Sequence, residues 1–128
     1  VLPYPSLNEV SYVTFEKEAT AEYHDELYGH LQAVACKEDA ACYCEEGFEA
    51  WLENHGVAKA ATWIRIKKDG TPRPAYPCTL PTRIRNFIHH PENQENSPRF
   101  TDGDLVTSIE LMRKVFKDIK SSAFYASR

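Results

Sequence analysis

The sequence predicts an all-α fold, a bundle of four to five helices, and three observations support this. Apolar side chains recur every three or four residues over most of the chain, which is the period of one helix face. Typical helix-start residues precede several of these runs. Only residues 57–67 would also fit a strand. The 128 residues, 42% of them hydrophobic, are enough for one buried core, so we expect a single domain over residues 1–128.

Two long helices are expected in the first half of the chain. Ser6-Leu7-Asn8-Glu9 has the form of a capping box. A helix from about Asn8 to Ala35 should follow, with one apolar face made of Tyr12, Phe15, Ala19, Tyr23, Leu27, Leu31 and Val34. A second helix is expected from about Glu38 to Asn54. It should end at His55-Gly56, because glycine accepts the left-handed backbone that closes many helices.

The middle of the chain is less regular. Residues 57–67 have the spacing of a short helix, but Thr62 to Ile66 would also form a strand; we favour the helix because the segment holds three alanines and we find no strand partner. Asp69-Gly70 indicates a turn. Four prolines then predict an irregular, semi-rigid connection: Pro72, Pro74, Pro77 and Pro81.

A short helix is expected between Pro81 and Pro91, since proline fits the first turn of a helix and disfavours the residue before it in a helix. Arg85 and His89 are four residues apart and should be neighbours on its surface, and His90 lies about 100° further around the axis. After a polar loop, a closing amphipathic helix should begin with Thr101 as its N-cap.

Charge is distributed unevenly along the chain. Residues 1–55 hold 12 acidic and 2 basic side chains, whereas residues 56–90 hold 1 acidic and 7 basic ones. The basic block leads into the helix with Arg85 and the histidines, which is compatible with a phosphate-bearing ligand. The other interpretation is that acidic and basic helices neutralise each other across the bundle.

Several classes of protein are not indicated. No apolar run is long enough for a membrane helix, and no secretion signal is present, so we expect no membrane association, reduced cysteines and a cytoplasmic setting. The four cysteines contain no C-x-x-C pair, and no metal or cofactor is expected. A weaker alternative is a metal site formed by Cys36, Cys42, Cys44 and Cys78 with His55 or His89. Because the chain begins with Val1, we expect either a processed protein or part of a larger one.

The group of Arg85, His89 and His90 is compatible with three roles. Arginine could bind an anion through its fork of donors. A histidine acting as general acid or base, together with the arginine, could cleave RNA without a metal. The same side chains could instead stabilise the fold by capping a helix or pairing with carboxylates.

Arg85-Asn86-Phe87-Ile88-His89-His90 resembles the R-x(4–6)-H motif of the HEPN superfamily of α-helical domains. Arg85 and His90 match the arginine and histidine of the motif, and Asn86 matches the polar residue that commonly follows the arginine. The longer phrase from Leu80 to Asn93, with a later Phe-Thr-Asp-x-Asp-Leu helix start, is similar to domains of bacterial defence and toxin–antitoxin proteins.

The resemblance implies a metal-independent endoribonuclease that often works as a homodimer. In it His90 would be the catalytic histidine, Arg85 would bind the scissile phosphate and Asn86 would orient a neighbour or the substrate. His89 is the other candidate for the active histidine. Basic residues expected to contact the RNA substrate are Arg83, Arg65, Lys67 and Lys68.

The resemblance also implies an alternative, because some HEPN domains have lost catalysis. The chain would then be a dimerisation or interaction module that docks an ATPase, a nucleotidyltransferase or an antitoxin partner. The acidic first half and the aromatic helix faces favour this alternative.

Overall fold

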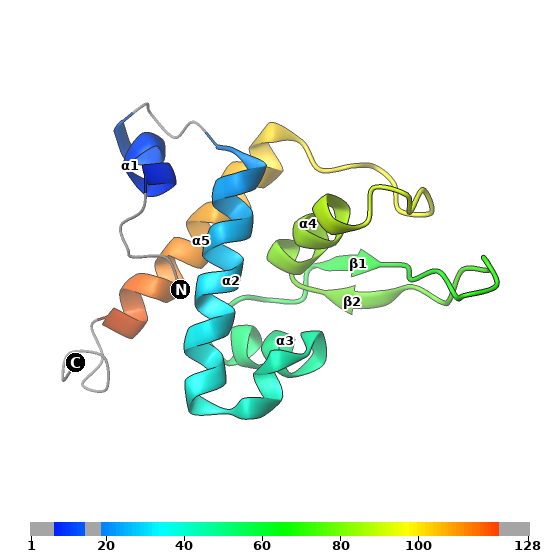
Figure 1. Cartoon of the computed structure of the whole chain (residues 1–128), viewed down its shortest axis with the longest axis horizontal. Helices are drawn as coiled ribbons and strands as arrows, with labels where there is room; N and C mark the ends of the chain where they lie inside the picture. Colours follow the sequence, from blue (N-terminus) through cyan, green and yellow to red (C-terminus); the bar gives the residue numbers. More distant parts are fainter. Residues whose placement is uncertain (1–6, 15–18, 121–128) are drawn as a thin grey trace.

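The computed structural model describes residues 7–14 and 19–120, and within them the predicted all-α bundle is confirmed (Figure 1). Five α-helices and one 3-10 helix are accompanied by a small antiparallel sheet of two strands, which lies at one side of the bundle (Figure 1). In chain order the elements are α1 (Leu7–Thr14), α2 (Ala21–Glu38), η1 (Ala40–Tyr43), α3 (Glu45–Asn54), β1 (Ala61–Trp63), β2 (Tyr76–Cys78), α4 (Leu80–His89) and α5 (Asp102–Lys120).

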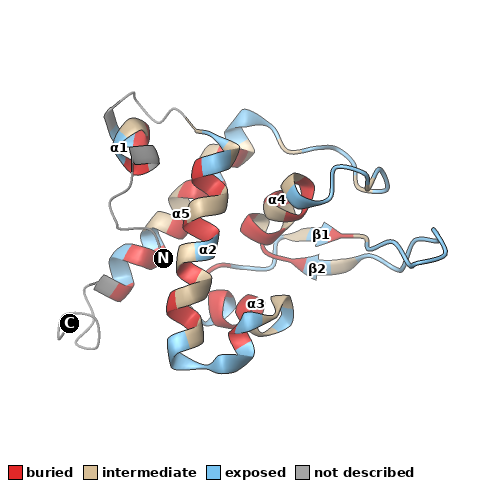
Figure 2. Ribbon diagram, in the orientation of Figure 1, coloured by how far each residue is buried: buried red, intermediate tan, exposed pale blue. Residues whose placement is uncertain are grey.

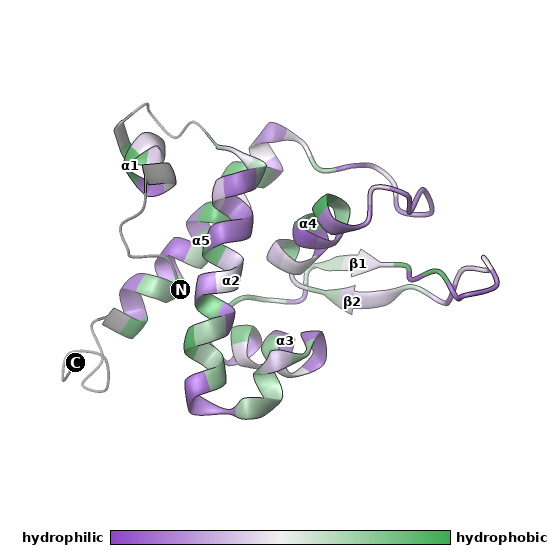
Figure 3. Ribbon diagram, viewed as in Figure 1, coloured by the Kyte–Doolittle hydropathy of each residue, from purple (hydrophilic) through white to green (hydrophobic). Residues whose placement is uncertain are grey.

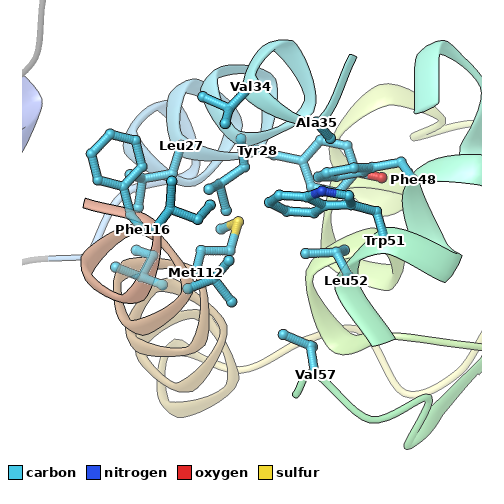
Figure 4. Close-up of a cluster of buried hydrophobic side chains, with 14 of the residues drawn as sticks. Leu27, Tyr28, Val34, Ala35, Phe48, Trp51, Leu52, Val57, Met112 and Phe116 are labelled. Carbon is cyan, nitrogen blue, oxygen red and sulfur yellow. The ribbon is translucent and has the colours of Figure 1, made fainter. Parts of the chain in front are cut away.

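Helix α2 is the centre of the bundle and packs against α5, α4 and α3 (Figure 1). Buried residues lie on the faces that these helices turn toward one another (Figure 2), and these faces are also the hydrophobic ones (Figure 3). The core between α2, α3 and α5 includes Leu27, Phe48, Leu52, Met112 and Phe116 (Figure 4).

The predicted single helix from Asn8 to Ala35 is wrong, because two helices occupy this range. Helix α1 ends at Thr14 and α2 begins at Ala21. Thr20 has an extended backbone, and its side chain accepts a hydrogen bond from the Tyr23 amide, so it caps a new helix. The predicted positions at residues 6 and 15 lie outside the described part of the chain.

The second predicted helix, Glu38–Asn54, starts too early. Asp39 is extended and its carboxylate caps η1, and α3 begins only at Glu45. The chain can fold back here because Gly47 lies under the carbonyl of Ala41; a Cβ at Gly47 would stand 2.1 Å from that oxygen. The predicted end at His55-Gly56 is confirmed, with Gly56 at φ +89°.

The helix favoured for residues 57–67 is wrong, and the strand alternative is the observed one. Strand β1 pairs with β2, which lies inside the segment expected to be irregular, and Thr62 stands opposite Pro77. Proline is tolerated because both strands of a two-stranded sheet are edges. The ribbon continues to a bridge between Ile66 and Pro72. Its tip extends away from the bundle and is hydrophilic (Figures 1 and 3).

The last two predicted helices are confirmed. Thr79 caps α4 and Pro81 lies in its first turn. In α5, the Thr101 side chain accepts from the Asp104 amide while the Asp104 carboxylate accepts from the Thr101 amide, which is a reciprocal cap.

The N-terminus of α4 is held by a buried carboxylate. Glu49 of α3 is only 4% exposed. One of its oxygens accepts from the Thr79 amide at 2.7 Å, and the other accepts from the hydroxyls of Thr79 at 2.6 Å and Thr82 at 2.8 Å. The negative charge also lies where the dipole of α4 is positive. Glu49 therefore fixes α4 against α3.

A buried histidine joins α2 to α5. His24 is fully buried, and its Nε2 lies 2.6 Å from the Ser108 hydroxyl. Burial lowers the pKa of the His24 imidazole from 6.5 to about 4, against an opposing contribution from Asp25. The folded chain therefore holds this imidazole neutral at pH values where an exposed histidine is protonated.

We predict that Glu49→Ala destabilises the fold by about 3 kcal/mol, because it leaves the Thr79 amide and two hydroxyls buried without their acceptor. Urea unfolding followed by circular dichroism measures the loss. The matched control is Glu53→Ala, an exposed glutamate of the same helix, which should change the free energy by less than about 0.5 kcal/mol. Equal effects of the two substitutions would contradict the role given to Glu49.

The His24 pKa predicts a loss of stability in weak acid. Between pH 6.5 and about 4 the unfolded chain binds a proton at this position and the folded chain does not, so stability falls as the pH falls. Between pH 7.5 and 5 the loss is about 2 kcal/mol. Urea unfolding across this range should show that the free energy of unfolding depends less on pH in His24→Gln, since glutamine cannot take up a proton. If the free energies of the two proteins changed with pH to the same extent, the lowered pKa assigned to His24 would be contradicted.

Candidate functional site

Three residues of the motif line one cleft beside α4. The cleft has a volume of about 470 Å³. Arg85, Asn86 and His90 come from α4 and its C-cap. Facing them are residues of the hairpin (β1, β2 and the chain between them), of α3 and of the segment after α4. These residues are Trp63, Arg65, Ile66, Glu45, Glu92 and Asn93. The structure therefore brings together side chains that a helix period alone placed only approximately.

The walls of the cleft are tied to each other by two asparagines. The Ile64 amide donates to Asn96 Oδ1 at 2.8 Å, and the Ile64 carbonyl accepts from Asn93 at 2.9 Å and from Asn96 at 3.0 Å. The segment following α4 is thus bonded to the backbone of the hairpin. The predicted polar loop at residues 91–100 consequently has a structural function, which is to attach the segment after α4 to the hairpin.

Arg85 is half-buried, and its guanidinium lies over the Tyr28 ring at 5.3 Å from the ring centroid. In the described part of the chain it forms no ion pair with a carboxylate. The Tyr28 hydroxyl lies 2.9 Å from the Thr82 hydroxyl, which fixes the ring. Arg85 is therefore a supported, partly desolvated cation facing a cleft, which is a favourable arrangement for an anionic ligand.

Asn86 is only 3% exposed and donates to Glu45 at 3.2 Å. The same Glu45 carboxylate accepts from the Arg65 guanidinium at 2.8 Å and from the Tyr76 hydroxyl at 2.6 Å. Burial by itself would raise the pKa of the Glu45 carboxyl, but the hydrogen bonds from Tyr76, Arg65 and Asn86 together lower it. Glu45 therefore stays charged and keeps Arg65 and Asn86 in place at the base of the cleft.

His90 is the C-cap residue of α4, and its amide donates to the Asn86 carbonyl at 2.9 Å. The imidazole is exposed, and its Nδ1 lies 3.3 Å from a carboxylate oxygen of Glu92. An imidazole held through Nδ1 leaves Nε2 available to a ligand in the cleft. Glu92 is thus in a position to orient the ring.

His89, the other candidate histidine, does not line the cleft. Its Nε2 lies 2.6 Å from the Asp25 carboxylate of α2, on another side of α4. The side chain therefore ties α4 to the central helix. His89 and His90 are adjacent in sequence but belong to different surfaces of the protein.

The residues predicted to contact RNA divide into three groups. Arg65 lines the cleft and is paired with Glu45. Lys67 and Lys68 are exposed near the tip of the hairpin. Arg83 is outside the cleft: it lies over the Phe87 ring at 4.6 Å and donates to the Pro98 carbonyl at 2.6 Å. Trp63 is buried against Phe87, so its ring is part of the core.

Glu45 and Tyr76 were not predicted as site residues. Neither belongs to a local motif: Glu45 reaches the cleft only through tertiary packing, and Tyr76 contributes by donating its hydroxyl hydrogen bond to Glu45. Within residues 7–14 and 19–120, no group of three or more histidine, cysteine or acidic side chains is placed to hold a metal ion.

No protein-family model, curated protein or solved structure matches this chain. In the described residues, no helix is both long enough and apolar enough to cross a membrane.

Proposed function

We propose that the protein is a metal-independent endoribonuclease of the HEPN type, with the cleft beside α4 as its active site. The observation that carries the proposal is that Arg85, Asn86 and His90 line the same cleft while Arg85 forms no ion pair within the described residues. A phosphodiester is the ligand that matches a half-buried guanidinium beside an accessible imidazole.

In this proposal Arg85 binds the scissile phosphate. Its position over the Tyr28 ring holds the guanidinium in place and removes part of its hydration. A prepositioned cation stabilises the additional negative charge that develops on the phosphate during attack. Asn86, held by Glu45, keeps its carboxamide directed at the base of the same cleft.

His90 would act as the general base. Its Nε2 would accept the proton of the ribose 2′-hydroxyl, whose oxygen attacks phosphorus and forms a 2′,3′-cyclic phosphate. The bond from phosphorus to the 5′ oxygen breaks, and that oxygen leaves with a proton from water. The Glu92 carboxylate beside Nδ1 stabilises the imidazolium that results. The basic hairpin residues Lys67 and Lys68 would contact flanking phosphates.

We predict that the protein cleaves single-stranded RNA in EDTA, and that Arg85→Ala and His90→Ala each lower the rate at least about 100-fold. His89→Ala is the matched control: it removes the neighbouring histidine, which faces Asp25 instead of the cleft. Its rate should stay within a few-fold of the parent. Cleavage is followed on an end-labelled oligonucleotide, with the cyclic phosphate product identified by mass spectrometry.

Two outcomes would refute the proposal. One is equal cleavage by the parent, Arg85→Ala and His90→Ala, which would indicate a contaminating nuclease. The other is a loss of activity in His89→Ala as large as that in His90→Ala, with an unchanged circular dichroism spectrum. That result would show that His90 is not distinguished from His89 in the chemistry, as the proposal requires.

A second candidate, a non-catalytic interaction module, is favoured by the surface of α1. Val10 is 49% exposed and Val13 is 60% exposed, and the two lie three residues apart on this helix. Exposed apolar side chains at helical spacing are typical of helix–helix contacts. In this alternative the chain would form a homodimer or dock an ATPase, nucleotidyltransferase or antitoxin partner.

For the second candidate we predict a dimer that dissociates when Val10 and Val13 are both replaced by Ser. Size-exclusion chromatography with light scattering measures the mass of the parent and the variant. A parent protein that is monomeric at high micromolar concentration would count against self-association through α1.

A further inference from the structure

A second pocket adjoins the cleft on the other side of the Glu45–Arg65 ion pair. Its volume is about 380 Å³. Glu45 and Arg65 line both spaces, so a chain-like ligand that leaves the cleft across this pair enters the second pocket directly. The remaining lining residues come from α3 and the hairpin and from the segment between them, namely Glu46, Glu49, Lys59, Arg73, Pro74, Tyr76 and Pro77.

The charges of the second pocket are not all available to a ligand. Arg65 is neutralised by Glu45, and the Glu49 oxygens accept three hydrogen bonds from Thr79 and Thr82. Lys59 is 3.9 Å from Glu53, a weak contact at the surface.

Arg73 has a fixed backbone and a free side chain. Its amide donates to the Arg65 carbonyl at 2.8 Å, which sets its place on the ribbon. Within the described residues its guanidinium forms no ion pair. Arg73 and Lys59 are therefore the cations that this pocket offers to an anion.

The walls between these charges include two proline rings and one tyrosine ring. Pro74 and Pro77 flank Ala75 and Tyr76 in the chain. The Tyr76 ring is held by its hydroxyl bond to Glu45 and by the Arg65 guanidinium at 5.2 Å from its centroid. Rigid rings of this kind accept the face of a nucleobase with little loss of conformational freedom. Glu46, which is exposed, adds a carboxylate that can accept from amino or imino groups of a base.

We propose that this pocket is a second nucleotide subsite, which holds the residue of single-stranded RNA next to the phosphate bound by Arg85. Lys59 and Arg73 bind its phosphate, and its base rests against Pro74, Tyr76 and Pro77. The subsite deepens the proposed function and depends on it, because the RNA strand is taken to run from the cleft across the Glu45–Arg65 pair.

The test is binding of a fluorescently labelled 2′-O-methyl RNA decanucleotide, which cannot be cleaved through its 2′ oxygen, measured by anisotropy at several salt concentrations. We expect the double variant Lys59→Ala/Arg73→Ala to bind at least about tenfold more weakly than the parent. The slope of log affinity against log salt should decrease by about 0.7, since the two cations contact a single phosphate and each single-strand phosphate contact contributes about 0.7. The matched control, Lys37→Ala/Lys114→Ala, removes two exposed lysines of α2 and α5 and should keep the parent's slope.

Each outcome of this test is decisive. Weaker binding with a reduced slope, unchanged circular dichroism and recovery in Lys59→Arg/Arg73→Lys supports the subsite. Parent-like binding by Lys59→Ala/Arg73→Ala, while Arg85→Ala binds weakly, overturns the subsite and leaves the cleft as the proposed active site. Failure of the parent to bind the decanucleotide at all overturns the subsite and the proposed function together.

Discussion

The three hydrogen bonds that Glu49 accepts at the start of α4 determine the geometry of the candidate site. Helix α4 is short, and an isolated helix of its length is not stable in water. Glu49 satisfies the cap residue and the first turn from the adjacent helix α3, while Ile84 and Phe87 bury its apolar face. Once the N-terminus is fixed in this way, the rotation of α4 about its axis is fixed too, and with it the side chains that face the cleft.

That rotation separates two histidines that are adjacent in the sequence. Successive residues of a helix point about 100° apart, so His89 meets Asp25 of α2 while His90, at the C-cap, meets Glu92 at the rim of the cleft. Arg85 and His90 can share the cleft because the helix ends between them and the backbone at His90 is no longer helical. The spacing of the motif therefore places Arg85 and His90 in one cleft only because the helix ends before Pro91.

The features that were predicted correctly from sequence are those encoded locally. The start of α4 at Pro81, the cap of α5 at Thr101 and the stop at Gly56 each depend on a few consecutive residues. The hairpin was not predicted, because β1 and β2 are held together by pairing between Thr62 and Pro77 and by the asparagines after α4. Glu45 and Tyr76 were missed for the same reason, since only tertiary packing brings Glu45 to Asn86 and Tyr76 to Glu45.

The uneven charge of the chain supported two interpretations, and the structure shows pairs of the kind that the second one expects. Acidic side chains of the first half do neutralise later cationic groups, as Glu45 does for Arg65 and Asp25 is placed to do for His89. Arg85 is different, because no carboxylate of the described residues pairs with it and an aromatic ring supports it instead. A half-buried guanidinium that faces a cleft without a carboxylate partner can form its ion pair with an external anion. This difference between Arg65 and Arg85 is the physical reason why the proposed function assigns a phosphate to Arg85.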